Sequence, residues 1–229
     1  MTVVQQIVYT ERPERWWALA ETLGFSPTFA PSPEWGEFHA DGVLAVHCAT
    51  ADHAAGGVDI HVLVPDLDAA ASALSAFDVS RETMDGVGEM LTVRTASGPA
   101  VTVSAGTGTV SGDIAVQPIW FQEDLTAPRA ILEALGLRAG IAADRGGWVE
   151  MRGDGGVVGL HSGSARVGLS FEARGDLDAH ARRLRDAGFD AAVVDEAFAR
   201  TIRIPDPDGG DEIWINGVQD DLYGYHREG

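Results

Sequence analysis

The reactive side chains of this sequence exclude several kinds of catalysis. None of the 229 residues is Lys, so a Schiff-base enzyme and a Walker-type phosphate-binding loop are both excluded. The single cysteine, Cys48, excludes an intrachain disulfide and a Cys-rich metal site. Cys48 follows His47 on a predicted strand, where consecutive side chains point to opposite faces, so the two are not expected to form a nucleophile–base pair. His161-Ser162-Gly163 lacks the Gly-x-Ser-x-Gly pattern of a serine hydrolase.

The chain is strongly acidic. Its 16 basic and 35 acidic residues give a formal net charge of −19. Because this charge repels phosphate backbones and anionic lipid head groups, nucleic acids and membrane surfaces are not expected partners. The N-terminal residues do not resemble a signal peptide, and no apolar run approaches the ~18 residues of a transmembrane helix. These features predict a cytoplasmic protein, either a monomer or a homodimer.

An internal repeat defines the domain organisation. Residues 4–7 align with residues 116–119, and the same offset continues until Gly24 aligns with Gly136. After single-residue insertions, Trp35 aligns with Trp148, and residues 43–47 align with residues 157–161. The repeat predicts a first domain over residues 1–106, a Gly/Ser/Thr-rich linker at 107–112, a second domain over residues 113–218 and a polar tail at 219–229.

Each domain contains two units of the order strand, helix, strand, strand, strand. In the first unit an apolar strand opens the chain, a helix predicted over residues 13–23 ends at Gly24, and two short strands form a hairpin. In the second unit Asp66 is the predicted N-cap of a helix over residues 67–77. The predicted units lie near residues 3–50, 58–105, 114–162 and 167–217.

Three motifs connect these units with a known group of proteins. The helix ends at residues 18–25 and 131–137 share a Leu-Gly-apolar step, residues 64–70 form a strand-to-helix step, and Asp206-Pro207-Asp208-Gly209 leads into a final strand at residues 212–216. Together they resemble the vicinal oxygen chelate superfamily, which includes glyoxalase I, bleomycin-resistance proteins, fosfomycin-resistance enzymes and extradiol dioxygenases. The resemblance implies an α+β fold in which four βαβββ units form two tandem domains, with curved mixed sheets that surround ligand-binding cups.

The resemblance also implies where a divalent metal would bind. In metal-dependent members, His or Gln on a unit's first strand and Glu on its last strand hold a metal that acts as a Lewis acid. The first-strand positions here hold Gln5, Asp59 or His61, Gln117, and Gly168 or Ser170. The last-strand positions hold Ala45 or His47, Thr102, Gly159 or His161, and Trp214. The absence of Glu from these positions argues against glyoxalase I activity, and the two-His, one-Glu pattern of extradiol dioxygenases is not found.

The sequence leaves open which units share a cup, because sequential and crossed pairing use the same residues. If the second and third units share one, His61, Gln117 and His161 converge and predict a partial site for a divalent metal. If the first and fourth units share one, that cup contains Gln5, His47, Ser170 and Trp214, and an indole replaces the carboxylate ligand.

Tryptophans on the predicted strands favour ligand binding over catalysis. Trp120 and Trp214 are predicted to wall the cup shared by the first and fourth units. An aromatic cup without metal ligands suits a planar or apolar molecule. The first hypothesis is therefore a glyoxalase/bleomycin-resistance-like protein that binds a small aromatic or cationic molecule without a complete metal site. Its predicted ligand-binding residues are Gln5, His47, Trp120, Trp214, Ser170 and Thr102. The alternatives are a metal-dependent lyase, isomerase or dioxygenase that uses His61, Gln117 and His161, and a domain that binds another protein and has vestigial cups.

Overall fold

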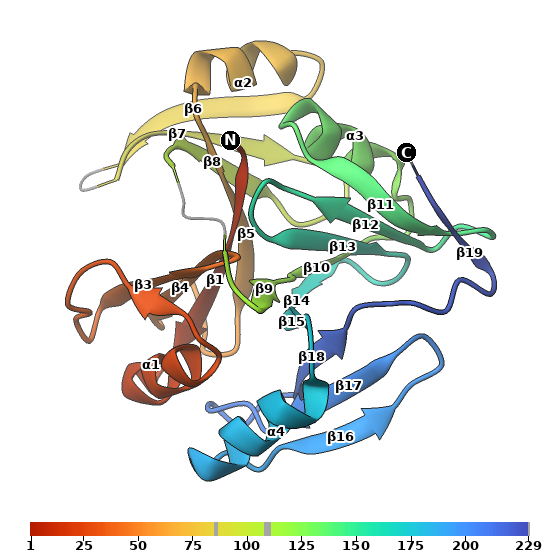
Figure 1. The fold of residues 1–229 in the computed structure, drawn as a ribbon. Coiled ribbons are helices and arrows are strands. Elements are labelled where there is room, and N and C mark those ends of the chain that lie inside the picture. The colour runs from red at the N-terminus through yellow and green to blue at the C-terminus, as the bar shows by residue number, and fades with distance from the viewer. Residues whose placement is uncertain (85–86, 108–110, 229) are drawn as a thin grey trace.

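The first two units form one continuous sheet. The computed structural model describes residues 1–84, 87–107 and 111–228. The elements of the first two units are β1 (Val3–Thr10), α1 (Pro13–Thr22), β2 (Ser26–Pro27), β3 (Trp35–Ala40), β4 (Gly42–Cys48), β5 (Val58–Val64), α2 (Leu67–Ala73), β6 (Asp78–Met84), β7 (Gly88–Arg94) and β8 (Val101–Ala105). They assemble into an eight-stranded sheet of the order β2-β3-β4-β1-β5-β8-β7-β6 (Figure 1).

The third and fourth units form a second, interrupted sheet. Their elements are β9 (Ile114–Val116), β10 (Ile119–Phe121), α3 (Thr126–Ala134), β11 (Arg138–Ala143), β12 (Trp148–Arg152), β13 (Val157–His161), β14 (Arg166–Gly168), β15 (Ser170–Ala173), α4 (Leu177–Asp186), β16 (Ala192–Asp195), β17 (Arg200–Ile204) and β18 (Ile213–Gly217), followed by β19 (Tyr225–Arg227). Pro118 separates β9 from β10, where it has no N–H to donate to a neighbouring strand. The sheet is consequently divided into a six-stranded part, β14-β10-β13-β12-β11-β19, and a five-stranded part, β16-β17-β18-β15-β9.

The units pair in sequence, first with second and third with fourth. In the first sheet β1 runs antiparallel to β5, with Gln5 opposite His61. In the second sheet β10 pairs with β14 and β9 pairs with β15. The crossed pairing that would have joined the second unit to the third, or the first to the fourth, is not formed. The predicted α+β class with mixed sheets is confirmed.

The local signals read from the sequence explain where the helices begin and end. Asp66 caps α2, because its carboxylate accepts hydrogen bonds from the backbone N–H groups of Asp68 and Ala69 at 2.9 and 3.0 Å. α1 begins at Pro13 and is followed by Gly24, whose φ of +91° is favourable for glycine. α2 ends at Ala73, earlier than the predicted Phe77.

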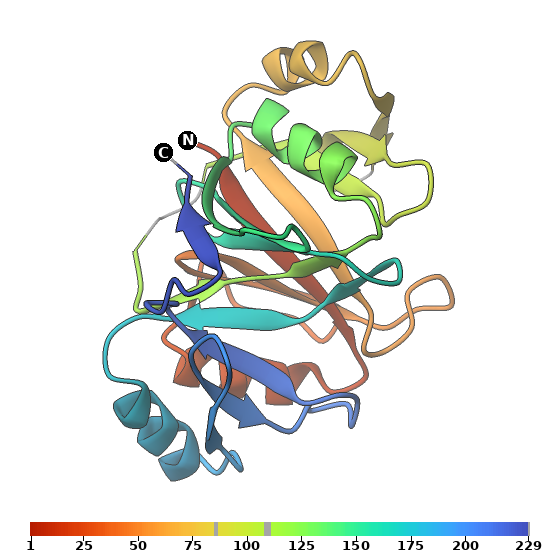
Figure 2. The same ribbon diagram turned by 90° about the vertical axis from the view of Figure 1, so that its right-hand side faces the viewer.

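The two sheets pack through their helix-bearing faces into one apolar core. In both views α1 and α4 lie at one end of the molecule, and α2 and α3 lie at the other (Figures 1 and 2). The repeat is also visible in the contacts between the sheets. The N–H of Val4 donates to the Gly155 carbonyl at 2.8 Å, and the N–H of Val116, the repeat equivalent of Val4, donates to the Asp41 carbonyl at 3.0 Å.

Gly42 and Gly156 permit this close approach of the two sheets. Both have positive φ values, +87° and +76°. A Cβ atom on Gly42 would lie 2.4 Å from Cγ2 of Val116, and one on Gly156 would lie 2.8 Å from Cβ of Val4. A larger residue at either position would therefore separate the sheets.

The C-terminal segment extends the edge of the second sheet. β19 pairs antiparallel with β11, and Arg129 on α3 holds the Glu228 carboxylate with an N–H···O bond of 2.9 Å. Residues 108–110 of the predicted linker and Gly229 of the predicted tail lie outside the described residues. Among the residues that are described, no helix is long and apolar enough to cross a membrane.

Candidate functional site

Each sheet has one face that carries no helix, and these faces are called the first and second cup. Side chains alternate along a strand, so β1 directs Val4 and Val8 into the core and Gln5 and Tyr9 into the first cup. The polar and aromatic residues of the first cup include Gln5, Tyr9, Trp35, Glu37, His39, His47, Asp59, His61, Thr102 and Ser104. Those of the second cup are Gln117, Phe121, Trp148, Glu150, Arg152, His161, Arg166, Ser170, Glu172, Thr201, Arg203, Trp214 and Asn216.

His61 lies in the floor of the first cup with both ring nitrogens occupied. Nδ1 is 2.7 Å from Oγ1 of Thr102 and Nε2 is 2.8 Å from Oγ of Ser104. Burial lowers the pKa of His61 to about 4, so the ring is neutral at pH 7. Of the predicted ligand-binding residues, Thr102 thus serves to orient His61.

Glu37 supplies a carboxylate to the first cup from β3. Its Oε1 accepts a hydrogen bond of 3.0 Å from Nε2 of Gln5, and its Oε2 lies 3.8 Å from Nε2 of His39. The contact with His39 and, after it, the bond from Gln5 lower the pKa of Glu37, so the carboxylate is charged at pH 7. The sequence hypothesis did not include Glu37, because it tested only the first and last strands of each unit.

Five rings form a continuous row along the rim of the first cup, and this row is called the first ring row. Its members, in spatial order, are Phe29, Trp35, His47, Tyr9 and His53. Successive ring centroids are 4.6, 6.3, 5.8 and 4.4 Å apart. Phe29 and Trp35 are 38% and 40% exposed, which is high for large apolar side chains. Tyr9 donates from its hydroxyl to Asp59 at 2.9 Å, which places a carboxylate beside the row.

The floor of the second cup is a network of neutral hydrogen bonds. Oε1 of Gln117 accepts a bond of 2.9 Å from Nδ2 of Asn216, and Oγ of Ser170 donates to the Gln117 carbonyl at 2.6 Å. Oγ1 of Thr201 donates to Oδ1 of Asn216 at 3.2 Å. The predicted residues Gln117 and Ser170 are therefore close together, and each already has a protein partner.

Arginines occupy much of the second cup. Arg152 pairs with Glu150, and with Glu172 through N–H···O bonds of 2.8 and 3.1 Å. Arg203 pairs with Glu196, and its guanidinium carbon lies 4.5 Å above the ring of Trp214. Trp214 consequently lies on the cup face, as predicted, but a protein cation already covers its ring.

The second cup repeats three members of the first ring row. Phe121, His161 and Trp148 align in the repeat with Tyr9, His47 and Trp35, and they form the second ring cluster. The His161 ring lies 5.1 Å from Phe121 and 6.1 Å from Trp148. A guanidinium carbon, that of Arg166, lies 3.6 Å from the Phe121 ring centroid.

Trp120 does not line the second cup, so this prediction is wrong. Its side chain is fully buried in the core, on the same face of the interrupted strand as Val116. Gln117 and Phe121 occupy the opposite face, because side chains alternate. The alternation from Gln117 was the signal in the sequence that could have placed Trp120 correctly.

The predicted metal ligands His61, Gln117 and His161 are not brought together. His61 lies in the first sheet. In the second sheet Gln117 is bonded to Ser170, whereas His161 lies opposite Phe121, on a different pair of strands. The second proposed set is also divided, because Gln5 and His47 lie in the first cup and Ser170 and Trp214 in the second. Over residues 1–84, 87–107 and 111–228, no group of three or more His, Cys, Asp or Glu side chains has the geometry to hold a metal ion.

The donors at the family's ligand positions also do not fit a divalent metal. Both nitrogens of His61 and the side-chain oxygen of Gln117 bind protein groups, and a tryptophan paired with a guanidinium replaces a carboxylate at residue 214. A metal at either position would have to displace these bonds or tolerate a neighbouring cation.

Solved structures similar to this chain are extradiol dioxygenases. The 2,3-dioxygenase LapB from Pseudomonas sp. KL28 aligns over 99% of this chain and 92% of its own, with a TM-score of 0.65 and 13% identity. Homoprotocatechuate 2,3-dioxygenase from Arthrobacter globiformis covers 99% and 80%, with a TM-score of 0.60 and 15% identity. The chain has the vicinal oxygen chelate fold.

At this level of identity the likeness shows the fold alone. The Brevibacterium fuscum homoprotocatechuate 2,3-dioxygenase, in complex with 3,4-dihydroxyphenylacetate, aligns over 96% of this chain and 81% of its own, with a TM-score of 0.60 and 16% identity. No protein-family model matches the sequence, and a comparison with curated proteins finds no significant relative. The resemblance read from the sequence motifs is thereby confirmed for the fold.

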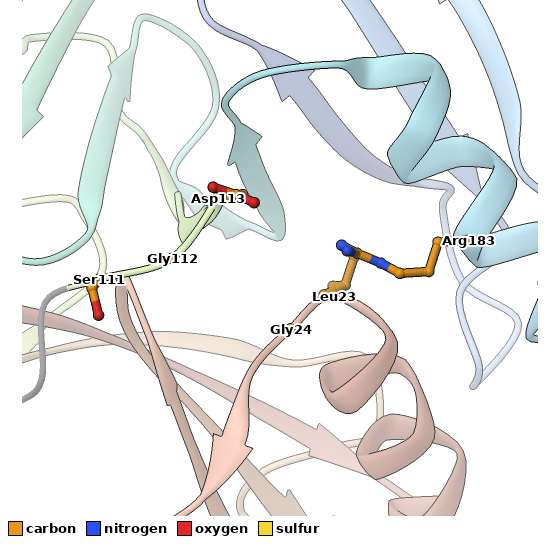
Figure 3. Close-up of a pocket in the computed structure, with 6 residues that line it drawn as sticks. All are labelled: Leu23, Gly24, Ser111, Gly112, Asp113 and Arg183. Atoms are coloured by element: carbon orange, nitrogen blue, oxygen red, sulfur yellow. The ribbon is translucent and has the colours of Figure 1, made fainter.

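A shallow hollow of about 370 Å³ lies outside both cups (Figure 3). Leu23 and Gly24 after α1, residues 111–113 before β9, and Arg183 on α4 line it. Its lining has one cationic and one carboxylate side chain and no aromatic ring, so it offers a ligand fewer contacts than either cup.

Proposed function

We propose that this protein binds a small cationic molecule with a planar or apolar body in the first cup, without a metal. The first ring row carries the proposal, because it presents exposed aromatic faces beside carboxylates. A cation over an aromatic face gains about 0.5–2 kcal/mol, depending on how far it is desolvated. A vicinal oxygen chelate structure in complex with 3,4-dihydroxyphenylacetate supports the binding of a small molecule by this fold.

The charges around the first ring row favour a cation. Asp59 and Glu37 lie on the same cup face as the row, and the pKa of Glu37 is lowered. Burial lowers the pKa of His47, so its ring is neutral at pH 7 and does not oppose a positive ligand. The overall net charge of −19 adds a long-range attraction for cations.

Calorimetric titration with benzyltrimethylammonium tests the proposal. We expect binding that persists in a metal chelator and that weakens at least tenfold in Trp35→Leu. Trp148→Leu is the matched control, because Trp148 is the repeat equivalent in the second cup, and it should leave the affinity unchanged. Equal losses in the two variants, or no binding to the wild type, would contradict the proposal.

Metal analysis tests the enzymatic alternative in the same preparation. The protein is supplemented with nickel, zinc, manganese and iron and then freed of excess metal. Stoichiometric metal that is lost in His61→Ala would replace the binding proposal with a metal-dependent enzyme. Loss of benzyltrimethylammonium binding after chelation would do the same.

A further inference from the structure

The second ring cluster lies beside an arginine, whereas the first ring row lies beside a carboxylate. In the first sheet Ile7 lies opposite Asp59, whereas its repeat equivalent Ile119 lies opposite Gly168. The second cup therefore lacks a carboxylate at the position of Asp59, and it has Arg166 opposite Phe121. We propose that the second ring cluster and Arg166 form a separate binding site for a small planar anion of the aryl carboxylate class.

Arg166 is the group that would bind the anion. Arg152 and Arg203 in the same cup are neutralised by glutamates, and Arg227 lies near Glu150. Arg166 makes no ion pair within the described part of the chain and lies over the Phe121 ring. Its side chain is exposed, and its guanidinium carbon lies 3.6 Å from the Phe121 ring centroid. The contact with the ring limits the movement of the guanidinium, and its N–H groups make no side-chain hydrogen bond or ion pair within the described residues, so they can donate the two parallel bonds that a carboxylate accepts.

The surrounding residues keep this arrangement open and aromatic. A Cβ atom on Gly168 would lie 3.0 Å from Cε2 of Phe121 and 3.1 Å from Nη1 of Arg166, so glycine there leaves room for the stacked pair. Nδ1 of His161 lies 2.7 Å from the Ser162 carbonyl, which can only accept, so Nδ1 donates and the ring orientation is set. The His161 and Trp148 rings then offer faces and edges to the body of an aryl ligand.

The two cups would consequently select ligands of opposite charge on the same backbone repeat. Tyr9 and Phe121 occupy equivalent positions, but Tyr9 donates to a carboxylate and Phe121 supports a guanidinium. The distinction depends on two side chains, Asp59 and Arg166, which can be changed independently because they lie in different sheets.

Titration with 2-naphthoate, with neutral 2-naphthamide as the comparison ligand, tests the second site. We expect naphthoate to bind the wild type and Asp59→Asn equally, and to bind Arg166→Gln at least tenfold more weakly. Arg182→Gln, which removes an exposed arginine from α4, is the matched control for a general loss of positive charge. Naphthamide should bind weakly to all four proteins.

Two results would overturn the anion site. One is unchanged naphthoate affinity in Arg166→Gln, and the other is an equal loss in Arg182→Gln. Thermal unfolding of each variant shows whether it has kept its fold. If Arg166→Gln is destabilised, Gly168→Ala provides the second test, because its Cβ would crowd both Phe121 and Arg166, and it too should weaken naphthoate binding. Benzyltrimethylammonium binding by the first cup is measured separately, so failure of one site is distinguishable from failure of the other.

Discussion

The two cups occupy equivalent places in the repeat but differ in where their tryptophan rings lie. In the first cup Ala45 lies in the floor, and Trp35 stands at the rim with 40% of its surface exposed. In the second cup the residue equivalent to Ala45 is Gly159, and the Trp148 ring lies directly over it: a Cβ there would be 2.5 Å from Cη2 of the indole. One missing methyl group thus lets the equivalent indole ring lie nearer the floor than the rim.

The charged and polar side chains of the two cups also differ. The first cup keeps a neutral histidine between two hydroxyl groups, and on the same face it has Glu37, which contacts Gln5 and His39, and Asp59, which accepts a bond from Tyr9. The second cup uses its carboxylates to neutralise Arg152 and Arg203, and it holds Arg166 over the Phe121 ring at its rim. The two halves share the order of their elements and three ring positions, whereas the charges beside the rings and the position of the tryptophan differ.

The largest expected difference between the cups is acid lability, because His61 has Ser170 as its counterpart. An unfolded histidine titrates near pH 6.5, but the pKa of native His61 is about 4. Below pH 6.5 the unfolded state binds a proton that the native state does not, so stability present above pH 6.5 is lost as the pH falls towards 4. The loss from this residue reaches about 3 kcal/mol for a shift of this size.

Urea unfolding at pH 7.0, 5.5 and 4.5 measures this effect. The free energy of unfolding of the wild type should fall more steeply with acidification than that of His61→Gln. Carboxylates contribute equally to both proteins, so the difference between the slopes isolates His61. Parallel slopes would mean that His61 is protonated in the folded protein.

Exchanging Gly159 and Ala45 tests whether the missing methyl group determines where the tryptophan ring lies. Gly159→Ala should destabilise the protein by about 2 kcal/mol, because the added methyl meets the Trp148 ring and Ile119. The reciprocal change, Ala45→Gly, should cost only about 0.5–1 kcal/mol, mainly through backbone entropy. Thermal or urea unfolding of the two variants compares these costs, and equal values would show that the indole adjusts freely.

The smallest expected effect concerns the strand that extends only the second sheet. Glu228→Gln removes the charge that Arg129 binds and should reduce stability by about 0.5 kcal/mol, since both side chains are about one-third exposed. Glu89→Gln, which affects the more exposed pair with Arg81 in the first sheet, is the control and should cost less. Urea unfolding at low and high salt measures both, and a larger effect for Glu89→Gln would show that β19 is held by its backbone alone.

Much of the fold could be predicted from the sequence because its signals are local. The repeat, the Asp66 cap, the Gly24 helix end and the hairpin at Asp41–Gly42 each depend on residues that are close in the chain. The positions on the cup faces also followed from alternation, and Trp120 was misplaced where Pro118 interrupts the strand.

The candidate sites could be predicted only in part. Gln5, His47, Thr102, Ser170 and Trp214 do lie on cup faces, but their roles in binding stay predictions. Glu37, Tyr9 and Arg166 were missed, because their importance comes from contacts with Gln5, Asp59 and Phe121 across neighbouring strands.

The sequence by itself determined the four βαβββ units, the acidic and Lys-free composition, and the repeat that aligns Trp35 with Trp148 and His47 with His161. Composition and periodicity are properties of the chain alone. Only the tertiary structure decided that consecutive units share a sheet, and hence that His61 faces Gln5 rather than Gln117. Sheet pairing joins strands that are far apart in the chain, and the free energy that selects one pairing comes from burying whole faces of apolar residues. The charges beside the first ring row and the second ring cluster follow from this choice of strand pairing.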